Sequence, residues 1–471
     1  MGRLGLRVSA GLVALGAALM VLCLDGVDNQ PYLRSPYYAE TSARLRERAT
    51  NATTARGDLT AGFGRARLTP TINASPEHPA QGQFHALPLA GYGDRRGRPA
   101  TGVHDDLYVK AVALRVGDRL GVIVGADALI LPREVAEMAV ARLGQELGLR
   151  REQVYLGATH THSSLGGWGA GMVAEAFAGQ YQPGVRIWFA DRIVTAAREA
   201  VADLKPASFG HGHFAAPEFI RNRLVGLKGR VDPEFSYALI KQPDGRLAVW
   251  GSYSAHATVL SGNNMEFSGD YPGYWQREVE QATGGMAVFL AGGVGSHSPV
   301  PGEGGFKGAE RMGQTLARAV LDRLSQTPLT NSLPFGIMGL EVSLPPLHAR
   351  ISDRFRFRPW VATRLLPVAP RSFIQAFRLG DSIWVSTPGD FSGELAGGIK
   401  DFLGVRGCAA VITSFNGDYI GYIIPARYYH LSGYEPRLMS FFGPNAPDYF
   451  DDLIRTMTLE LVNSRSPRSV E

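Results

Sequence analysis

From Val154 to Trp168 the chain reads Val-Tyr-Leu-Gly-Ala-Thr-His-Thr-His-Ser-Ser-Leu-Gly-Gly-Trp. The apolar run 154–158 predicts a buried strand, and a loop rich in serine and glycine follows it. If the extended backbone continues, His160 and His162 point to the same side, because residues two apart share a face. Such a pair could bind one metal ion, could divide into one ligand and one acid–base group, or could cap the strand.

The strand before His160 closes a pattern of strand, Gly/Asp turn, strand, helix and strand that the chain repeats. We expect three such units, each with a first strand, a second strand, a helix and a last strand, in that order. The first unit has these elements at 108–114, 120–126, 132–147 and 154–158. The second has them at 235–240, 247–253, 274–283 and 286–291, and the third at 373–379, 383–386, 393–403 and 409–414. Hairpins joined to helical crossovers produce mixed sheets covered by helices. The sequence therefore predicts an α/β fold.

Polar side chains that can bind a metal follow the second strand and the last strand of every unit. Those after second strands are Asp127, His256 and Asp390, and those after last strands are His160, Ser298 and Tyr422. In open α/β sheets, sites form where strands end and helices begin. Two histidines and a carboxylate form a known zinc ligand set. By position Asp127 should also face this site, where it either orients a histidine ligand or caps its own strand.

The N-terminus carries Arg3 and Arg7, then an uncharged run from Val8 to Leu24. This length is at the lower limit for a membrane span, and basic residues before the run favour an orientation with the bulk of the chain outside the cytoplasm. We expect residues 1–24 to form a retained signal-anchor or a cleaved signal peptide, followed by a polar tether or loose helix at 25–57 and one domain at 58–471. The domain would then be periplasmic or extracellular, anchored to the membrane or secreted.

Composition narrows the class of partner. The 471 residues are 45% apolar and carry a net charge of +5, which is too mild and dispersed to indicate nucleic-acid binding. Only Cys23 and Cys408 are present, so no intrachain disulfide is expected.

Between residues 350 and 378, arginines alternate with Phe355, Phe357 and Trp360, which indicates either a solvated face or a surface for anionic lipid. The oligomeric state is not indicated by the sequence.

Several short motifs occur together in one order. They are Gly102-Val-His104, His160-Thr-His162-Ser, Asn222-Arg223, Ser254-Ala-His256, Ser268-Gly-Asp270, Ser298-Pro299, Pro388-Gly-Asp390-Phe and Tyr419-x-x-Tyr422 followed by Tyr434. In sequence and order they resemble the neutral/alkaline (non-lysosomal) ceramidases, over residues from about 59 to 446. We expect the catalytic domain alone, without the C-terminal β-sandwich that many members carry.

The resemblance implies roles for individual residues. It implies a Zn²⁺ ion held by His160, His256, Asp390 and Tyr422, with His162 as a nearby acid–base group or oxyanion partner. It also implies that Ser298 is the catalytic serine and that Arg223 and Tyr434 bind the substrate around the scissile amide. The reaction implied is hydrolysis of the N-acyl bond of ceramide or a similar lipid at a membrane surface. The sequence does not choose between water and Ser298 as the nucleophile.

Three departures from the family pattern leave the substrate open. Asp390 stands where the family has a glutamate, His297 precedes Ser298, and Leu224 follows Arg223. His297 is either a general base or points away from the serine, as alternate residues of a strand do. Two alternatives therefore remain beside a ceramidase: a zinc hydrolase of another N-acyl or ester lipid, and an inactive lipid-binding domain.

Overall fold

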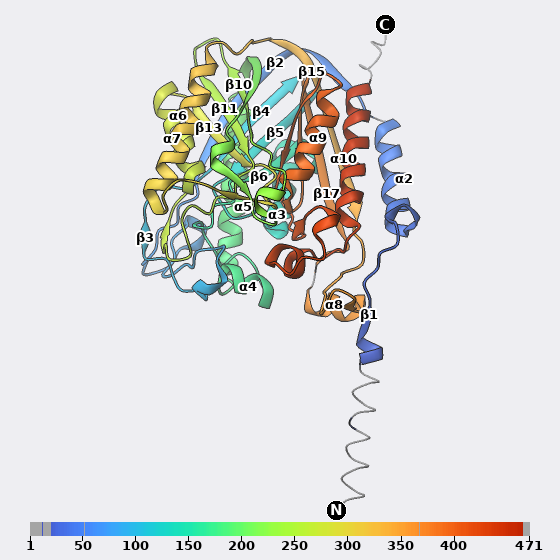
Figure 1. The fold of residues 1–471 in the computed structure, drawn as a ribbon. Helices are drawn as coiled ribbons and strands as arrows, with labels where there is room; N and C mark the ends of the chain where they lie inside the picture. Colours follow the sequence, from blue (N-terminus) through green and yellow to red (C-terminus); the bar gives the residue numbers. More distant parts are fainter. Residues whose placement is uncertain (1–11, 13–19, 51, 367, 465–471) are drawn as a thin grey trace, which may run out of the picture.

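The computed structural model describes residues 12, 20–50, 52–366 and 368–464, and Figure 1 shows two sheets stacked face to face between helices. The larger sheet has the order β20-β18-β17-β15-β2-β4-β5-β6, with β7 beside β2, and the smaller has the order β13-β11-β10-β8. In the larger sheet the strands are β2 (Thr54–Arg67), β4 (Tyr108–Val116), β5 (Arg119–Ala126), β6 (Val154–Ala158), β7 (Lys205–Pro206), β15 (Ser332–Ser343), β17 (Arg371–Leu379), β18 (Ser382–Ser386) and β20 (Ala409–Thr413). In the smaller sheet they are β8 (Ser208–Ala215), β10 (Glu234–Lys241), β11 (Leu247–Tyr253) and β13 (Met286–Ala291).

Helices cover the outer face of each sheet and complete four layers. The helices on the larger sheet are α2 (Pro36–Thr50), α3 (Arg133–Leu147), α5 (Pro183–Ala202), α9 (Gly393–Gly404) and α10 (Ala446–Asn463), and those on the smaller sheet are α6 (Asp270–Thr283) and α7 (Gly305–Leu324). One apolar cluster fills the space between the sheets, where Trp250 meets Trp384 at 5.6 Å between ring centroids. Burial of apolar faces on both sides of each sheet holds this architecture together.

The three expected units are confirmed, each with an antiparallel hairpin and a helical crossover to a parallel strand. The hairpins are β4–β5, β10–β11 and β17–β18. The crossovers use α3, α6 and α9 and lead to the parallel pairs β5–β6, β11–β13 and β18–β20. Helix α6 begins at Asp270, four residues before its expected start, because Pro272 falls in the first turn, where proline does not interrupt the helix. The prediction of mixed sheets covered by helices therefore holds.

The segment before β2 forms a helix, as one of the two expectations for it has it, but this helix is not loose. Thr41 and Leu45 of α2 are buried, and the Tyr449 hydroxyl donates to Thr41 Oγ1 at 2.7 Å, so this helix packs on the body. The buried pair at positions i and i+4 makes one narrow apolar stripe, a weak signal in an otherwise polar stretch. The predicted anchor at 1–24 falls mostly on residues outside the described part. Among the described residues, no helix has both the length and the apolar character needed to cross a bilayer.

Two small sheets complete the end of the molecule where the units terminate. Strand β19 (Asp390–Phe391) pairs in parallel with β21 (Tyr422–Ile423), and the register aligns Asp390 with Tyr422. Strand β14 (His297–Pro299) pairs with β9 (Ile220–Asn222). These pairings bring segments that are far apart in the sequence to the ends of β6, β11 and β18.

Candidate metal centre

Three histidine side chains from two units converge at the ends of β6 and β11. His160 Nε2 lies 2.8 Å from His256 Nε2, and His162 Nε2 lies 3.3 Å from His160 Nε2. The backbone of His160 is left-handed, with φ of 62°, so the convergence does not come from a continued strand as expected but from a turn directly after β6. A ring of Phe415 stacks on His160 at 4.1 Å and fixes the plane of its imidazole.

Backbone carbonyls set the tautomers of two of these histidines. His160 Nδ1 lies 2.6 Å from the Leu129 carbonyl oxygen, and His256 Nδ1 lies 3.2 Å from the Val294 carbonyl oxygen. A carbonyl only accepts, so Nδ1 of His160 carries the proton and its Nε2 presents a lone pair. His256 has a second neighbour at Nδ1, the donor Arg223 Nη1 at 3.4 Å, but the Val294 carbonyl is the nearer of the two, so we assign the proton of His256 to Nδ1 as well. Two lone pairs at 2.8 Å repel unless a cation lies between them. This arrangement fits a metal ion.

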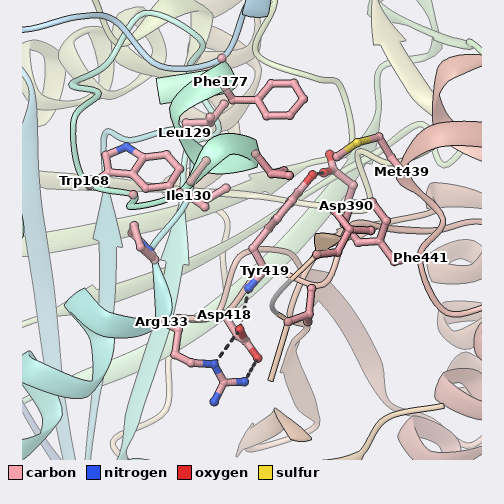
Figure 2. Close-up of a pocket in the computed structure, with 18 of the residues that line it drawn as sticks. Leu129, Ile130, Arg133, Trp168, Phe177, Asp390, Asp418, Tyr419, Met439 and Phe441 are labelled. Carbon is pink, nitrogen blue, oxygen red and sulfur yellow. Dashed lines mark hydrogen bonds and ion pairs between the residues drawn. The ribbon is translucent and has the colours of Figure 1, made fainter. Parts of the chain in front are cut away.

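Asp390 adds an oxygen to the same point. Its Oδ1 atom lies 3.4 Å from His160 Nε2 and 3.8 Å from His256 Nε2. The residue is fully buried, and among the described residues Oδ1 has no hydrogen-bond donor. The other oxygen, Oδ2, accepts a hydrogen bond of 2.8 Å from the Tyr419 hydroxyl, as Figure 2 shows. A buried carboxylate with one free oxygen beside two imidazole lone pairs satisfies the ligand set expected for zinc.

Burial keeps the imidazoles in the form that binds metal. The pKa of His256 lies well below its usual value, first because of burial and then because His160 and the Arg223 guanidinium lie close to it. The pKa of His162 is lowered for the same first reason. His162 differs in one respect: its buried Nδ1 has no hydrogen-bond partner in the described part of the chain. Metal-bound histidines normally donate this second N–H, so His160 and His256 match ligands more closely than His162 does.

The other expected site residues surround this centre. The ring of Tyr422 lies parallel to that of His256 at 6.5 Å, and Tyr434 meets Tyr422 edge-on at 6.0 Å. Arg223 places Nη1 3.4 Å from His256 Nδ1 and Nη2 2.6 Å from Glu435 Oε1. The structure therefore brings His160, His162, His256, Asp390, Tyr422, Arg223 and Tyr434 together.

A cavity of about 330 Å³ opens beside the centre. Its walls are mostly apolar and include Leu129, Ile130, Trp168, Phe177, Met439 and Phe441, which Figure 2 shows around Asp390. His160, His162 and Asp390 form part of the wall. A cavity of this kind can hold an aliphatic chain next to a polar reacting group.

Residues 79–299 match the family described as neutral/alkaline non-lysosomal ceramidase, N-terminal. The resemblance to the neutral/alkaline ceramidases is confirmed. The fold is similar to that of neutral ceramidase from Pseudomonas aeruginosa, with a TM-score of 0.70 and 19% identity over 88% of this chain and 76% of that chain. It is also similar to a structure described as ceramidase complexed with C2, with a TM-score of 0.71 and 18% identity over 88% of this chain and 77% of that one. A comparison with curated proteins gives no match.

Ser298, the serine that the resemblance implies as catalytic, makes no contact with this centre among the described residues. Ser298 is half-buried in β14, opposite Arg221 of β9. In the described part of the chain its hydroxyl makes no hydrogen bond to a histidine of the centre, and its role stays a prediction. His297 packs against α9: a Cβ atom on Gly393 would lie 1.9 Å from its Cε1 atom. Burial lowers the pKa of His297 to about 4.

Asp127 does not orient a histidine of this ceramidase-like centre. Its Oδ2 atom accepts a hydrogen bond from the Tyr108 backbone N–H at 2.9 Å, and Oδ1 accepts one from Gln276 Nε2 at 2.7 Å. Both oxygens are therefore engaged at the end of the β4–β5 hairpin and on α6. The expectation that Asp127 faces the centre is wrong, because an equivalent position in a repeat does not fix the direction of a side chain. The alternative of a cap on its own strand is the one observed.

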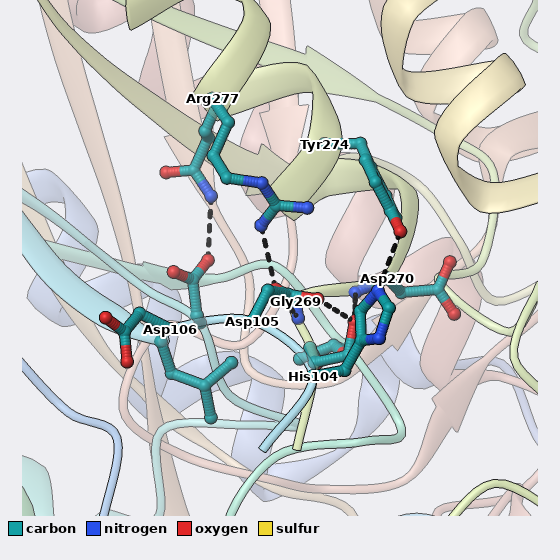
Figure 3. A network of polar contacts seen from close by, with 12 residues as sticks. His104, Asp105, Asp106, Gly269, Asp270, Tyr274 and Arg277 are labelled. Atoms are coloured by element: carbon teal, nitrogen blue, oxygen red, sulfur yellow. Dashed lines mark hydrogen bonds and ion pairs between the residues drawn. The ribbon is translucent and has the colours of Figure 1, made fainter. Parts of the chain in front are cut away.

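A second polar network supports the loop that carries His162, and Figure 3 shows its members around Asp105. Asp105 accepts hydrogen bonds from Ser268 Oγ at 2.5 Å and the Gly269 N–H at 2.9 Å, and pairs with Arg277 at 2.8 Å. Ser268 in turn bonds the 161–163 loop through its backbone: its N–H donates to the Ser163 carbonyl at 2.9 Å, and its carbonyl accepts from Thr161 Oγ1 at 2.8 Å. Asp105 and Tyr419 are positioning residues that the sequence did not single out, although Tyr419 lies within a quoted motif and Asp105 directly follows one.

Proposed function

We propose that this protein is a zinc-dependent amidohydrolase that cleaves the N-acyl amide bond of ceramide or a similar N-acyl lipid. The products are a fatty acid and an amine, the sphingoid base in the case of ceramide. The observation that carries the proposal is the pair of opposed imidazole lone pairs beside the free oxygen of Asp390, at the wall of an apolar cavity. The confirmed family resemblance supports a lipid amide as the substrate.

The metal would be held by His160, His256 and Asp390, and the family resemblance adds Tyr422 as a fourth ligand. When bound, zinc supplies a Lewis acid that polarises the amide carbonyl. Unactivated amides are slow electrophiles, so a large part of the barrier has to be removed in this way and by the surrounding hydrogen-bond donors.

The residues of this chain account for the remaining steps. The apolar cavity holds the acyl chain and excludes bulk water. The neutral His162 accepts a proton from the attacking hydroxyl group, of water or of Ser298, and passes it to the leaving nitrogen. The C–N bond breaks as a C–O bond forms, and one water molecule is consumed overall. Arg223, which contacts His256, and Tyr434, which contacts Tyr422, would donate hydrogen bonds to the carbonyl oxygen as negative charge develops there.

The proposed setting is the outer side of a membrane. The uncharged run at 8–24 would anchor the chain, and the catalytic domain would lie in the periplasm or outside the cell. Alternatively, cleavage of this run would release a secreted enzyme.

One experiment separates the proposal from its alternatives. The purified protein is assayed for bound metal and for fatty acid released from N-acyl-sphingosine, from another N-acyl lipid and from a lipid ester. We expect about one zinc per chain and the fastest release from N-acyl-sphingosine. Faster release from another lipid would reassign the substrate. Bound lipid with no release from any of the three would indicate a lipid-binding domain without activity.

A further inference from the structure

Exposed apolar side chains gather at the end of the molecule that holds α8 (Pro359–Leu365). Trp360 of α8 and Phe355 of β16 (Phe355–Phe357) are each 52% exposed, and Leu438 is 63% exposed. The segments are tied to one another, because Arg437 pairs with Asp353. We call Ile351, Phe355, Trp360 and Leu438 the α8 patch. Side chains of this size are not left in water without a cost in free energy, so a cluster of them marks a contact surface.

The N-terminal segment joins the body at the α8 patch. Strand β1 (Leu24–Gly26) pairs with β16, and the Arg358 N–H donates to the Cys23 carbonyl at 2.8 Å. Directly before this contact, Met20, Val21 and Leu22 are all exposed, and they end the uncharged run that begins at Val8. An anchored chain would therefore leave the bilayer within a few residues of the α8 patch.

The mouth of the cavity lies at the same end. Leu366 and Val368, which follow α8, line one side of the cavity, and Met172 and Val173 of α4 (Met172–Ala178) line another. Figure 1 shows α4, α8 and β1 together at this end of the molecule. Met172 is 77% exposed, so a large apolar side chain is also exposed at the mouth.

The charges around the α8 patch favour an anionic partner. Arg354, Arg358 and Arg364 are exposed there, and none of them has an acidic partner among the described residues. Arg364 lies over the Trp360 ring at 5.3 Å, an aromatic–cation pair typical of lipid headgroup regions. Of the nearby acids, Asp353 is paired with Arg437, and Asp25 lies 3.8 Å from Arg356.

We propose that the α8 patch docks onto a bilayer that contains anionic lipid, so that the cavity mouth faces the membrane and the N-acyl lipid passes between α4 and α8. The route of the lipid rests on the proposed function, but the docking does not. A second copy of the chain would cover the same patch without any need for arginines, so the charge pattern favours the bilayer.

Tryptophan fluorescence tests the docking directly. Of the six tryptophans, Trp168, Trp188, Trp250, Trp275 and Trp384 are buried, and Trp360 is the exposed one. The full chain is reconstituted into vesicles of phosphatidylglycerol and phosphatidylcholine with brominated acyl chains. We expect quenching of the wild-type emission and loss of that quenched component in Trp360→Phe. A control adds Val405→Trp to this variant, because Val405 is exposed at the end of α9 remote from Asp390. The control should not be quenched.

Two results would overturn the proposal: no Trp360-dependent quenching in vesicle-bound protein, or equal quenching in the Val405→Trp control. A change of oligomeric state in Phe355→Ser, together with no quenching of Trp360 in the wild type, would assign the patch to a second copy instead.

Activity gives a second, separate readout. We expect Phe355→Ser and Trp360→Ser each to slow hydrolysis of an N-acyl lipid held in vesicles by about tenfold, since each removes an aromatic contact with the bilayer. Hydrolysis of a dispersed short-chain N-acyl substrate and the Val405→Ser control should stay at the wild-type rate. Equal slowing on both substrates would contradict docking. Absence of hydrolysis in the wild type would refute the proposed function and leave the quenching result to decide the docking.

Discussion

The backbone carbonyls of Leu129 and Val294 decide the chemistry of two buried histidines. They hold the Nδ1 protons of His160 and His256, and both rings then present lone pairs to one point. His162 reaches the same point without a fixed tautomer. At the scale of the residue, His160 and His162 are therefore not equivalent. His160 is oriented as a ligand, and His162 is free to exchange a proton.

This difference predicts the outcome of two single substitutions. His160→Ala should lose bound zinc, and His162→Ala should keep it while turnover falls by about 10²–10⁴-fold, the range for loss of a general acid–base group. Metal analysis of both purified variants, paired with rates of fatty-acid release, makes the comparison. Equal loss of zinc in the two variants would show that His162 is a ligand.

Tyr419 offers a test of the support around Asp390. Tyr419→Phe removes the hydroxyl that holds Oδ2 at 2.8 Å and should weaken zinc affinity by about 10–100-fold with the fold unchanged. Competition with a chromogenic chelator measures this affinity. Tyr428→Phe, which removes a hydroxyl away from the centre, serves as the control. Wild-type affinity in Tyr419→Phe would mean that Asp390 needs no such support.

His297 makes stability depend on pH. Burial lowers its pKa to about 4, below the usual value of about 6.5 in an unfolded chain, so the unfolded state binds the proton first. Its contribution to the free energy of unfolding is complete above about pH 6.5 and is lost as the pH falls toward 4, up to about 3 kcal/mol. Urea titrations at several pH values should show a shallower dependence in His297→Gln. The exposed His430→Gln should match the wild type, and equal slopes in all three proteins would refute this role.

At the scale of the element, α9 is locked to the second unit by a buried ion pair. Lys400 Nζ lies 2.9 Å from Asp232 Oδ2 and 3.2 Å from Glu234 Oε1, and its side chain is 13% exposed. Opposite charges raise the pKa of Lys400 despite its burial. The helix begins three residues after Asp390, so this contact fixes the third unit relative to the histidine of the second.

Neighbouring charges on α9 give a matched comparison. Lys400→Met leaves Asp232 buried without its partner and should lower the free energy of unfolding by about 3–5 kcal/mol. Asp401→Asn breaks an exposed pair with Arg230 and should change it by less than about 1 kcal/mol. Chemical denaturation measures both. Similar small changes would show that the buried pair does not lock the helix.

The units themselves could be predicted because their signals are local. Gly/Asp turns between apolar runs mark hairpins, and helical periodicity marks α3 and α9. The packing of α2 on the body could not be predicted from the sequence, because it depends on contacts of Thr41 and Leu45 with residues that are distant in the chain. Tyr419 and Asp390 meet only through the pairing of β19 and β21, a tertiary contact without a sequence pattern. Asp127 shows that a repeat can also mislead. Its position in the first unit is equivalent to those of His256 and Asp390, but Tyr108 and Gln276 bind its carboxylate, so it does not face the centre.

At the scale of the whole molecule, three units meet at one end, and each supplies one of the residues proposed to hold the metal: His160, His256 and Asp390. The larger sheet joins the first and third units through β2 and β15, and the smaller sheet brings in the second. A metal at this point would bind three units together as well as act on a substrate. The cavity beside it and the α8 patch lie at the same end, so binding of lipid and chemistry share one face of the fold.

The most direct test of this account is the release of fatty acid and sphingoid base from N-acyl-sphingosine by the full-length protein, before chelation, after chelation and after zinc is restored. We predict equal molar amounts of the two products, loss of release on chelation and recovery with zinc, with no recovery in the His160→Ala/His256→Ala variant. Undiminished release from the metal-free protein or from this variant would contradict the account.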